Sequence, residues 1–164
     1  MSWEEFKRLA KITEENFAKN LKDPVWSTRE EDMFEHWDVK GILGNELLKF
    51  DIKGMKKKNR WDNKFQDDIA WVEGTNVRGN PGWVKGKADY IVFERLDYWL
   101  LVWREDLLNL VNLKLKENNF QKGKGVYQIY QRDGRQDKIT MVPFEDIEKI
   151  NNVKRINKNA ETNI

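Results

Sequence analysis

A Gly44-Asn45 pair that separates two runs of alternating apolar and polar residues constrains the fold of this chain more than any other feature. Such alternation is typical of half-buried β-strands, and glycine at the first central position suits a type II′ hairpin turn. We therefore predict a β-hairpin within the stretch Glu35 to Lys58. Folding the chain about this turn sets the facing pairs: Leu43 with Glu46, Ile42 with Leu47, Val39 with Phe50, and Asp38 with Asp51.

The two faces of this hairpin differ in chemistry, because side chains alternate along a strand. One face carries the apolar residues of a predicted core: Trp37, Val39, Leu43, Leu48, Phe50 and Ile52. The other face carries Asp38, Asp51 and Lys53. Facing like charges destabilise a sheet, and two close carboxylates raise the pKa of one of them. Two explanations stay open: a divalent cation removes the repulsion, or Lys40, Lys49 and Lys53 neutralise the acids on a solvated face.

A divalent cation at this position would indicate phosphodiester hydrolysis. Mg²⁺ is typically held by one or two carboxylates together with waters and substrate phosphates. A bound metal polarises a phosphoryl oxygen and lowers the pKa of a bound water, while an adjacent lysine stabilises developing negative charge. Asp38, Asp51 and Lys53 supply the side chains for this chemistry.

Asp38, followed by Asp51-Ile52-Lys53 on a predicted strand, resembles the signature of the PD-(D/E)XK nuclease superfamily. The resemblance implies a restriction-endonuclease-like fold in which Asp38 and Asp51 are Mg²⁺ ligands. It also implies that Lys53 assists the nucleophile or the transition state. Trp37 stands where the namesake proline would be, and Asp51 replaces the commoner glutamate.

An amphipathic helix is predicted from Trp3 to Leu21, with Ser2 as its N-cap. Its apolar stripe consists of Trp3, Phe6, Ala10, Phe17 and Leu21. Glu14 lies near this stripe, whereas Glu15 points away from it. The resemblance implies that a glutamate of the first helix can join the metal site. Glu14 is the candidate, and an ordinary surface acid is the alternative.

Thr28 and Glu31 form a T-x-x-E capping-box pattern, which predicts a short helix before the hairpin. His36, the only histidine, would share the face of Asp38 if the strand alternation extends back to it. A role beside the site is one interpretation, and a structural or exposed histidine is the other.

The densest basic cluster directly follows the hairpin and includes an aromatic residue. It contains the candidate nucleic-acid contacts Lys56, Lys57, Lys58, Arg60 and Trp61. Basic residues contact phosphates, and an aromatic ring stacks on bases. Lys85 and Lys87 are further candidates, because nearby glycines permit close backbone approach. A solvated loop and a plain turn are the respective alternatives.

Glu73 is a further candidate site acid, because it lies among apolar neighbours on a strand predicted over residues 69–77. A surface position near the strand end is the alternative. Strands are also predicted over residues 88–95, 98–104 and 138–142, and helices over 106–115 and 143–150, with Asp106 as a cap. The whole order predicts an α+β or α/β domain, in which helices flank a mixed central sheet.

Length and composition predict one domain over residues 1–150 and a polar, flexible tail over residues 151–164. The chain contains no cysteine, which excludes disulfides and thiolate metal sites. Its net charge is only +2, so local clusters must indicate any nucleic-acid partner. Without a signal peptide or an apolar run long enough to span a membrane, we expect a cytoplasmic protein.

The leading hypothesis is an enzyme, a Mg²⁺-dependent DNA nuclease of restriction, repair, junction-resolving or phage type, with Mn²⁺ as a substitute metal. One alternative is a non-catalytic nucleic-acid-binding or scaffold protein. Another is a metal-dependent hydrolase of small phosphorylated substrates, which a closed pocket would favour. A homodimer is compatible with each of these hypotheses.

Overall fold

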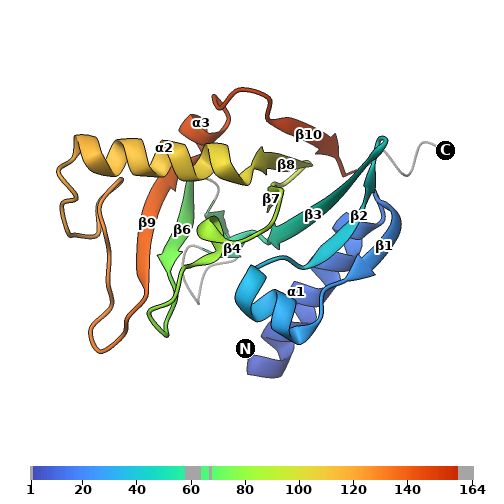
Figure 1. Ribbon diagram of the computed structural model, residues 1–164, viewed down its shortest axis with the longest axis horizontal. Helices are drawn as coiled ribbons and strands as arrows, with labels where there is room; N and C mark the ends of the chain where they lie inside the picture. Colours follow the sequence, from blue (N-terminus) through green and yellow to red (C-terminus); the bar gives the residue numbers. More distant parts are fainter. Residues whose placement is uncertain (1, 58–63, 67, 159–164) are drawn as a thin grey trace. The chain divides into compact units, whose positions relative to one another are not determined.

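The computed structural model describes residues 2–57, 64–66 and 68–158 (Figure 1). Contacts within the chain divide it into two compact units. Unit 1 comprises residues 1–55, 87–101 and 155–164, and unit 2 comprises residues 56–86 and 102–154. Both units draw on the 1–150 range, for which the sequence predicts one domain.

Unit 1 is built mainly on a six-stranded mixed sheet, whose strands lie in the order β1-β2-β3-β7-β8-β10. Its strands are β1 (Lys22–Trp26), β2 (Val39–Leu43), β3 (Glu46–Lys53), β7 (Tyr90–Glu94), β8 (Tyr98–Trp103) and β10 (Lys154–Asn157). β2 and β3 are antiparallel, whereas β3 and β7 are parallel. The predicted class, a mixed sheet combined with helices, is therefore confirmed.

The β2–β3 hairpin has the predicted register, with Val39 opposite Phe50 and Leu43 opposite Glu46. Gly44 adopts a φ of 65°, while Asn45 has no positive φ, as a type II′ turn requires. The apolar face is buried, apart from Leu43, which is half-buried beside the turn. A locally encoded turn and a two-residue alternation thus suffice to set this register.

Helix α1 (Trp3–Ala18) begins with the predicted Ser2 cap, completed by Glu5 as a capping box. It ends at Ala18, three residues before the predicted end, because Leu21 turns into β1. The Phe17 ring packs between Phe50 (centroids 5.2 Å apart) and Trp99 (5.5 Å), which anchors α1 to the sheet.

The short π-helix η1 (Glu31–Glu35) connects β1 to β2. The predicted capping box is present: Glu31 N–H donates to Thr28 Oγ1 (3.2 Å), and Thr28 N–H donates to Glu31 Oε1 (2.9 Å). η1 ends at His36, whose φ of 57° is left-handed. The strand alternation therefore does not extend back to His36, and its predicted place on the face of Asp38 does not follow.

Unit 2 contains two small antiparallel sheets, β4 (Lys56–Lys57) with β5 (Phe65–Gln66) and β6 (Ile69–Thr75) with β9 (Lys138–Pro143). Its helices are η2 (Trp83–Lys85), α2 (Arg104–Glu117) and α3 (Phe144–Ile147). Asp106 lies in the first turn of α2 and is not its cap, which is Trp103. Buried Val72, Leu107 and Ile147 belong to the core of this unit.

A flexible tail is predicted from residue 151, and the structure describes this segment up to Lys158. Within it, β10 forms an edge of the six-stranded sheet, and Lys158 pairs with Glu94 (Nζ to Oε2, 3.0 Å). The rest of the predicted tail lies outside the described residues, so its flexibility stays a prediction. No helix within the described residues is long and apolar enough to cross a membrane.

Candidate active site

The hairpin brings the two predicted aspartates together at the carboxyl end of β3. Asp51 lies within β3, and Asp38 directly precedes β2. Asp38 N–H donates to Phe50 O (2.8 Å), so Asp38 continues the ladder toward Asp51. The Asp38 side chain is fixed as well, because its Oδ2 accepts the Ile52 N–H (2.7 Å).

Asp51 is much more buried than a solvated hairpin face would allow. Only 4% of the residue is exposed, whereas Asp38 is half-buried. The Lys53 ammonium lies 3.1 Å from Asp51 Oδ1. Asp51 Oδ2 is also buried, and no donor among the described residues reaches it. An unsatisfied buried carboxylate oxygen is costly, so Asp51 Oδ2 lacks a partner among the described residues that would stabilise it.

Glu14 completes a row of three carboxyl groups. α1 brings Glu14 to Asp38, and Asp38 in turn adjoins Asp51, so that a shared proton can link each neighbouring pair. The angular position of Glu14 on its helix favours it over Glu15 as the candidate helix acid. The structure thus places Glu14, Asp38, Asp51 and Lys53 in one cluster within unit 1.

Burial raises the pKa of each acid in the row, and repulsion from a neighbouring carboxylate of the row adds to the shift for Glu14 and Asp38. Desolvation is the larger cause for Glu14 and the Asp38 charge the next, which together raise the pKa of Glu14 to about 8. Desolvation and then the Asp51 charge raise the pKa of Asp38 to about 8. Desolvation also raises the pKa of Asp51, and Lys53 opposes this shift. Like-charged buried carboxyls resist ionising together.

The cluster fits a divalent cation that keeps much of its water. No group of three or more acids or histidines among the described residues forms a ready-made metal cage. Mg²⁺ needs only one or two carboxylates, and waters and substrate phosphates complete its octahedron. Asp38 and the unsatisfied Asp51 Oδ2 are suited to such a site.

Three other predicted site residues lie on segments of the chain that do not contribute to this cluster. Glu73 is on β6 of unit 2, opposite Ile139. Lys85 is on η2 of unit 2, and Lys87 belongs to unit 1, where its N–H donates to Glu35 O (2.7 Å). Their roles stay predictions.

The predicted basic cluster is only partly described by the structure. Lys56 and Lys57 form β4, opposite Gln66 and Phe65. Lys58, Arg60 and Trp61 lie outside the described residues. The predicted phosphate contacts of this segment therefore stay predictions.

Asp32 is an acid of the site region that the sequence patterns did not single out. It lies on η1, and its charge contributes to the raised pKa values of both Glu14 and Asp51. The T-x-x-E pattern located this helix, but the pattern does not encode the π-helical winding that sets the direction of Asp32.

Comparisons with models of known protein families, with characterised proteins and with solved structures find no match to this chain. The functional reading therefore depends on the residues and their geometry.

Proposed function

We propose that this protein is a Mg²⁺-dependent nuclease that hydrolyses DNA phosphodiester bonds, with Mn²⁺ as a substitute metal. The observation that carries the proposal is the buried Asp51 carboxylate, which has Lys53 beside Oδ1 and, among the described residues, no donor on Oδ2. Asp38 adjoins Asp51, and Glu14 adjoins Asp38. A row of buried carboxyl groups is costly to ionise unless a cation offsets their charge.

The helix acid, the acid before one strand and the acid-x-lysine on its neighbour are the arrangement that the PD-(D/E)XK resemblance implies. On this basis we assign unit 1 to a restriction-endonuclease-like fold that acts on cytoplasmic DNA. β3 continues parallel to β7, and ligands of open α/β sheets bind beyond the carboxyl ends of such strands.

Each side chain has a distinct role in the proposed reaction. Asp38 and Asp51 would hold the metal, which when bound would supply polarisation of a phosphoryl oxygen and a lowered pKa of a bound water. Lys53 is half-buried beside Asp51 and stabilises the negative charge that grows on the phosphate oxygens. Glu14, with its raised pKa, accepts a hydrogen bond or a proton from water on the helix side of the site.

A hydrolase of small phosphorylated substrates finds less support. A hollow in unit 2 is lined by aliphatic and polar residues such as Val72, Leu108, Val111 and Thr140, together with Lys85 and Lys138. Its lining contains no carboxylate to hold a metal. The acids gather instead in unit 1, at the end of β3.

The test is a panel of linear, nicked, branched and single-stranded DNAs incubated with Mg²⁺, Mn²⁺ or EDTA. We expect cleavage of at least one substrate with either metal and none in EDTA. Asp51→Asn keeps the shape of the side chain and removes its charge, so it should be inactive. Binding without cleavage by the folded wild-type protein would instead support the non-catalytic alternative. Equal cleavage by wild type and Asp51→Asn would refute the assignment of the site.

A further inference from the structure

A second pair of like charges faces across the hairpin, one step from the acids. Lys40 lies directly opposite Lys49 in the β2–β3 ladder. Residues two apart on a strand share a face and are separated by about 6.6–6.8 Å. Lys49 is therefore on the same side of β3 as Asp51 and Lys53. The ladder presents a lysine pair beside an acid pair.

A buried aromatic ring holds both lysines in place. Trp37 is only 1% exposed, and the ammonium groups of Lys40 and Lys49 lie 5.9 and 5.2 Å from its ring centroid. The Lys49 ammonium also lies 3.7 Å from Glu35 Oε1, and 37% of its side chain stays exposed. These lysines are thus pre-ordered and accessible.

Two acids, Glu31 and Glu35, lie near this pair, and both also accept hydrogen bonds from groups other than the lysines. Glu35 Oε1 also accepts the Trp37 Nε1–H (3.0 Å), and Glu31 Oε1 accepts the Thr28 N–H of the capping box (2.9 Å). Each ammonium has three donors, and facing like charges destabilise a sheet. A hairpin selected for stability alone would gain from an opposite charge at one of these two positions.

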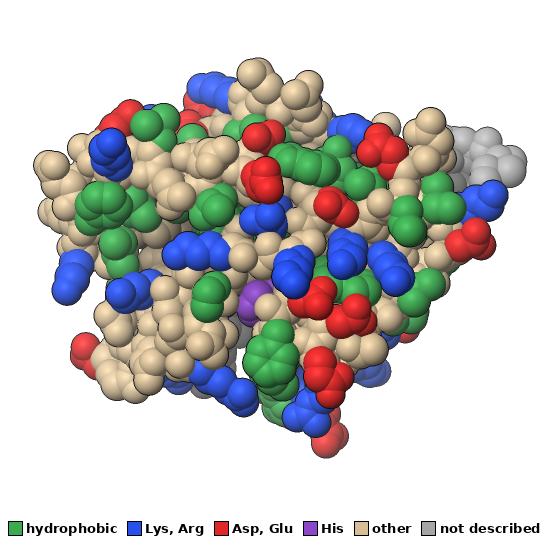
Figure 2. Space-filling view, viewed as in Figure 1, with side chains coloured by type: hydrophobic (Ala, Val, Ile, Leu, Met, Phe, Trp, Pro, Cys, Tyr) green, Lys and Arg blue, Asp and Glu red, His purple; other side chains and the backbone are tan. Residues whose placement is uncertain are grey.

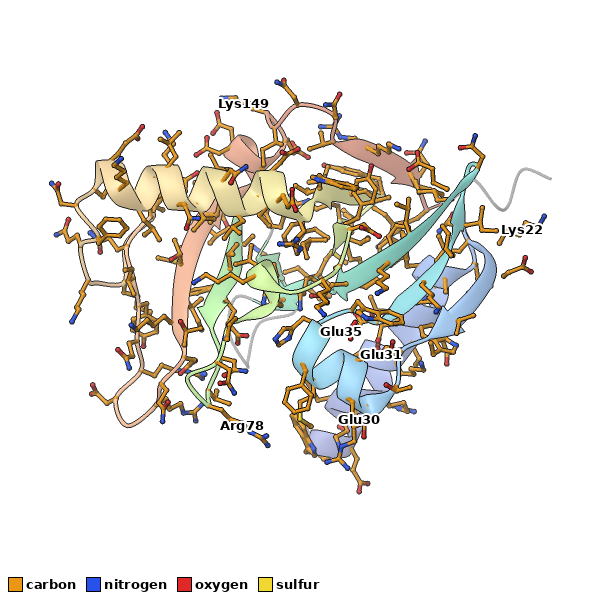
Figure 3. The ribbon with its side chains drawn as sticks, in the orientation of Figure 1. Lys22, Glu30, Glu31, Glu35, Arg78 and Lys149 are labelled. Atoms are coloured by element: carbon orange, nitrogen blue, oxygen red, sulfur yellow. The ribbon has the colours of Figure 1, made fainter. Side chains whose placement is uncertain are left out.

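We propose that Lys40 and Lys49 together bind a backbone phosphate of DNA next to the phosphate that is cleaved. The inference rests on the proposed nuclease function and adds a subsite to it. The two ammonium groups can each donate to one of the two non-bridging oxygens of a phosphodiester, and their spacing from Asp51 places them one step along the substrate. Figure 2 shows basic and acidic side chains gathered where Figure 3, in the same orientation, labels Glu31 and Glu35.

The test compares the double variant Lys40→Ala/Lys49→Ala with Lys22→Ala as a matched control. Lys22 is an exposed lysine of the same sheet, opposite Ile42, and Figure 3 shows it at the far end of the hairpin from Glu35. Each protein is assayed on a DNA oligonucleotide and on bis(p-nitrophenyl) phosphate, a single phosphodiester without neighbouring phosphates.

We expect the double variant to lose roughly tenfold or more in kcat/KM on DNA, and the slope of log Kd against log salt to fall by about 1. Hydrolysis of the small diester should not change, and Lys22→Ala should resemble wild type on both substrates. Unchanged DNA cleavage, or an equal loss on both substrates, would overturn the subsite.

Salt-dependent DNA binding in EDTA separates the subsite from the nuclease assignment. If the wild type binds DNA without cleaving it, the nuclease function fails, and a smaller salt slope in the double variant would still support the lysine pair. An unchanged slope would overturn the pair. Lys40→Gln and Lys49→Gln, which keep the apolar stems over Trp37, replace the alanine variants if thermal unfolding shows that those do not fold.

Discussion

Two buried aspartates, one in each unit, have similar burial but different surroundings. Asp51 in unit 1 is 4% exposed and Asp137 in unit 2 is 1% exposed, and each has one carboxylate oxygen without a donor among the described residues. Asp137 Oδ2 accepts hydrogen bonds from Arg132 Nε (3.1 Å) and Nη2. Asp51 has Lys53 on one oxygen and two further acids beyond it.

An unsatisfied carboxylate oxygen is therefore not by itself the mark of a site. An arginine that donates two hydrogen bonds offsets the charge of Asp137. At Asp51 two further carboxyl groups adjoin in a row, and one lysine does not offset their repulsion if all three ionise. The grouping of several carboxyl groups, more than the missing hydrogen bond, distinguishes a candidate metal site from a structural ion pair.

The largest expected effect is the difference in DNA cleavage between variants of the two aspartates. Asp51→Asn should lower Mg²⁺-dependent DNA cleavage by about 10³-fold, because the neutral amide is a poor ligand for a hard cation. Asp137→Asn should leave cleavage within about threefold of wild type, since Asp137 pairs with an arginine and belongs to unit 2, whereas the acid row belongs to unit 1. Cleavage assays on both folded variants check this, and equal losses would remove the distinction.

Lys53→Ala is expected to separate metal binding from catalysis. Cleavage should fall roughly 10²-fold, because the ammonium that stabilises transition-state charge is gone. Mg²⁺ binding should persist or tighten, since one positive charge has left the cluster. Calorimetry beside cleavage assays provides the measurement. A folded Lys53→Ala protein with full activity would end the proposed role of this residue.

Stability should respond to the two aspartates with opposite signs. Asp137→Ala removes the partner of Arg132 and should lower the free energy of unfolding by about 1–3 kcal/mol. The loss stays moderate because the Arg132 side chain is 41% exposed and regains water. Asp51→Asn should raise the stability of the metal-free protein at pH 8, where it removes a buried repulsive charge. Urea denaturation with EDTA checks both, and a stability loss in Asp51→Asn would contradict this account.

A smaller effect is expected from pH. Glu14 and Asp38 keep their protons in the folded protein up to a pKa of about 8, whereas the unfolded chain loses them near pH 4. The folded state thus binds more protons, and the free energy of unfolding of the metal-free protein falls as pH rises from about 4 to 8. Because Glu14 is partly exposed, water screens its charge, and the change in the free energy of unfolding is correspondingly smaller. Thermal unfolding of wild type and Glu14→Gln checks this, since the variant should show the weaker pH dependence.

The hairpin and its acids could be predicted because their signals are local. Gly44-Asn45 encodes the turn, alternation sets the register, and helical periodicity directs Glu14 toward Asp38. The depth of Asp51 could not be predicted, because burial depends on contacts between segments that are distant in sequence.

The pairing of β10 with the sheet and the division into two units could not be predicted either, because both depend on contacts between segments that are distant in sequence. The sequence also predicts Trp37 on the apolar face of the hairpin. It is buried as expected, but it precedes β2. Its ring contacts Lys40 and Lys49, which the alternation places on the other face of the hairpin.

Mg²⁺ titration calorimetry at pH 8 on wild type, Asp51→Asn and Asp137→Asn tests the central claim most directly. If the acid row in unit 1 is the metal site, the wild type and Asp137→Asn should each bind Mg²⁺ and release protons, since the raised pKa values of Glu14 and Asp38 leave these groups partly protonated. Asp51→Asn should show no binding heat. Equal Mg²⁺ binding by wild type and Asp51→Asn, or none by the wild type, would contradict the claim.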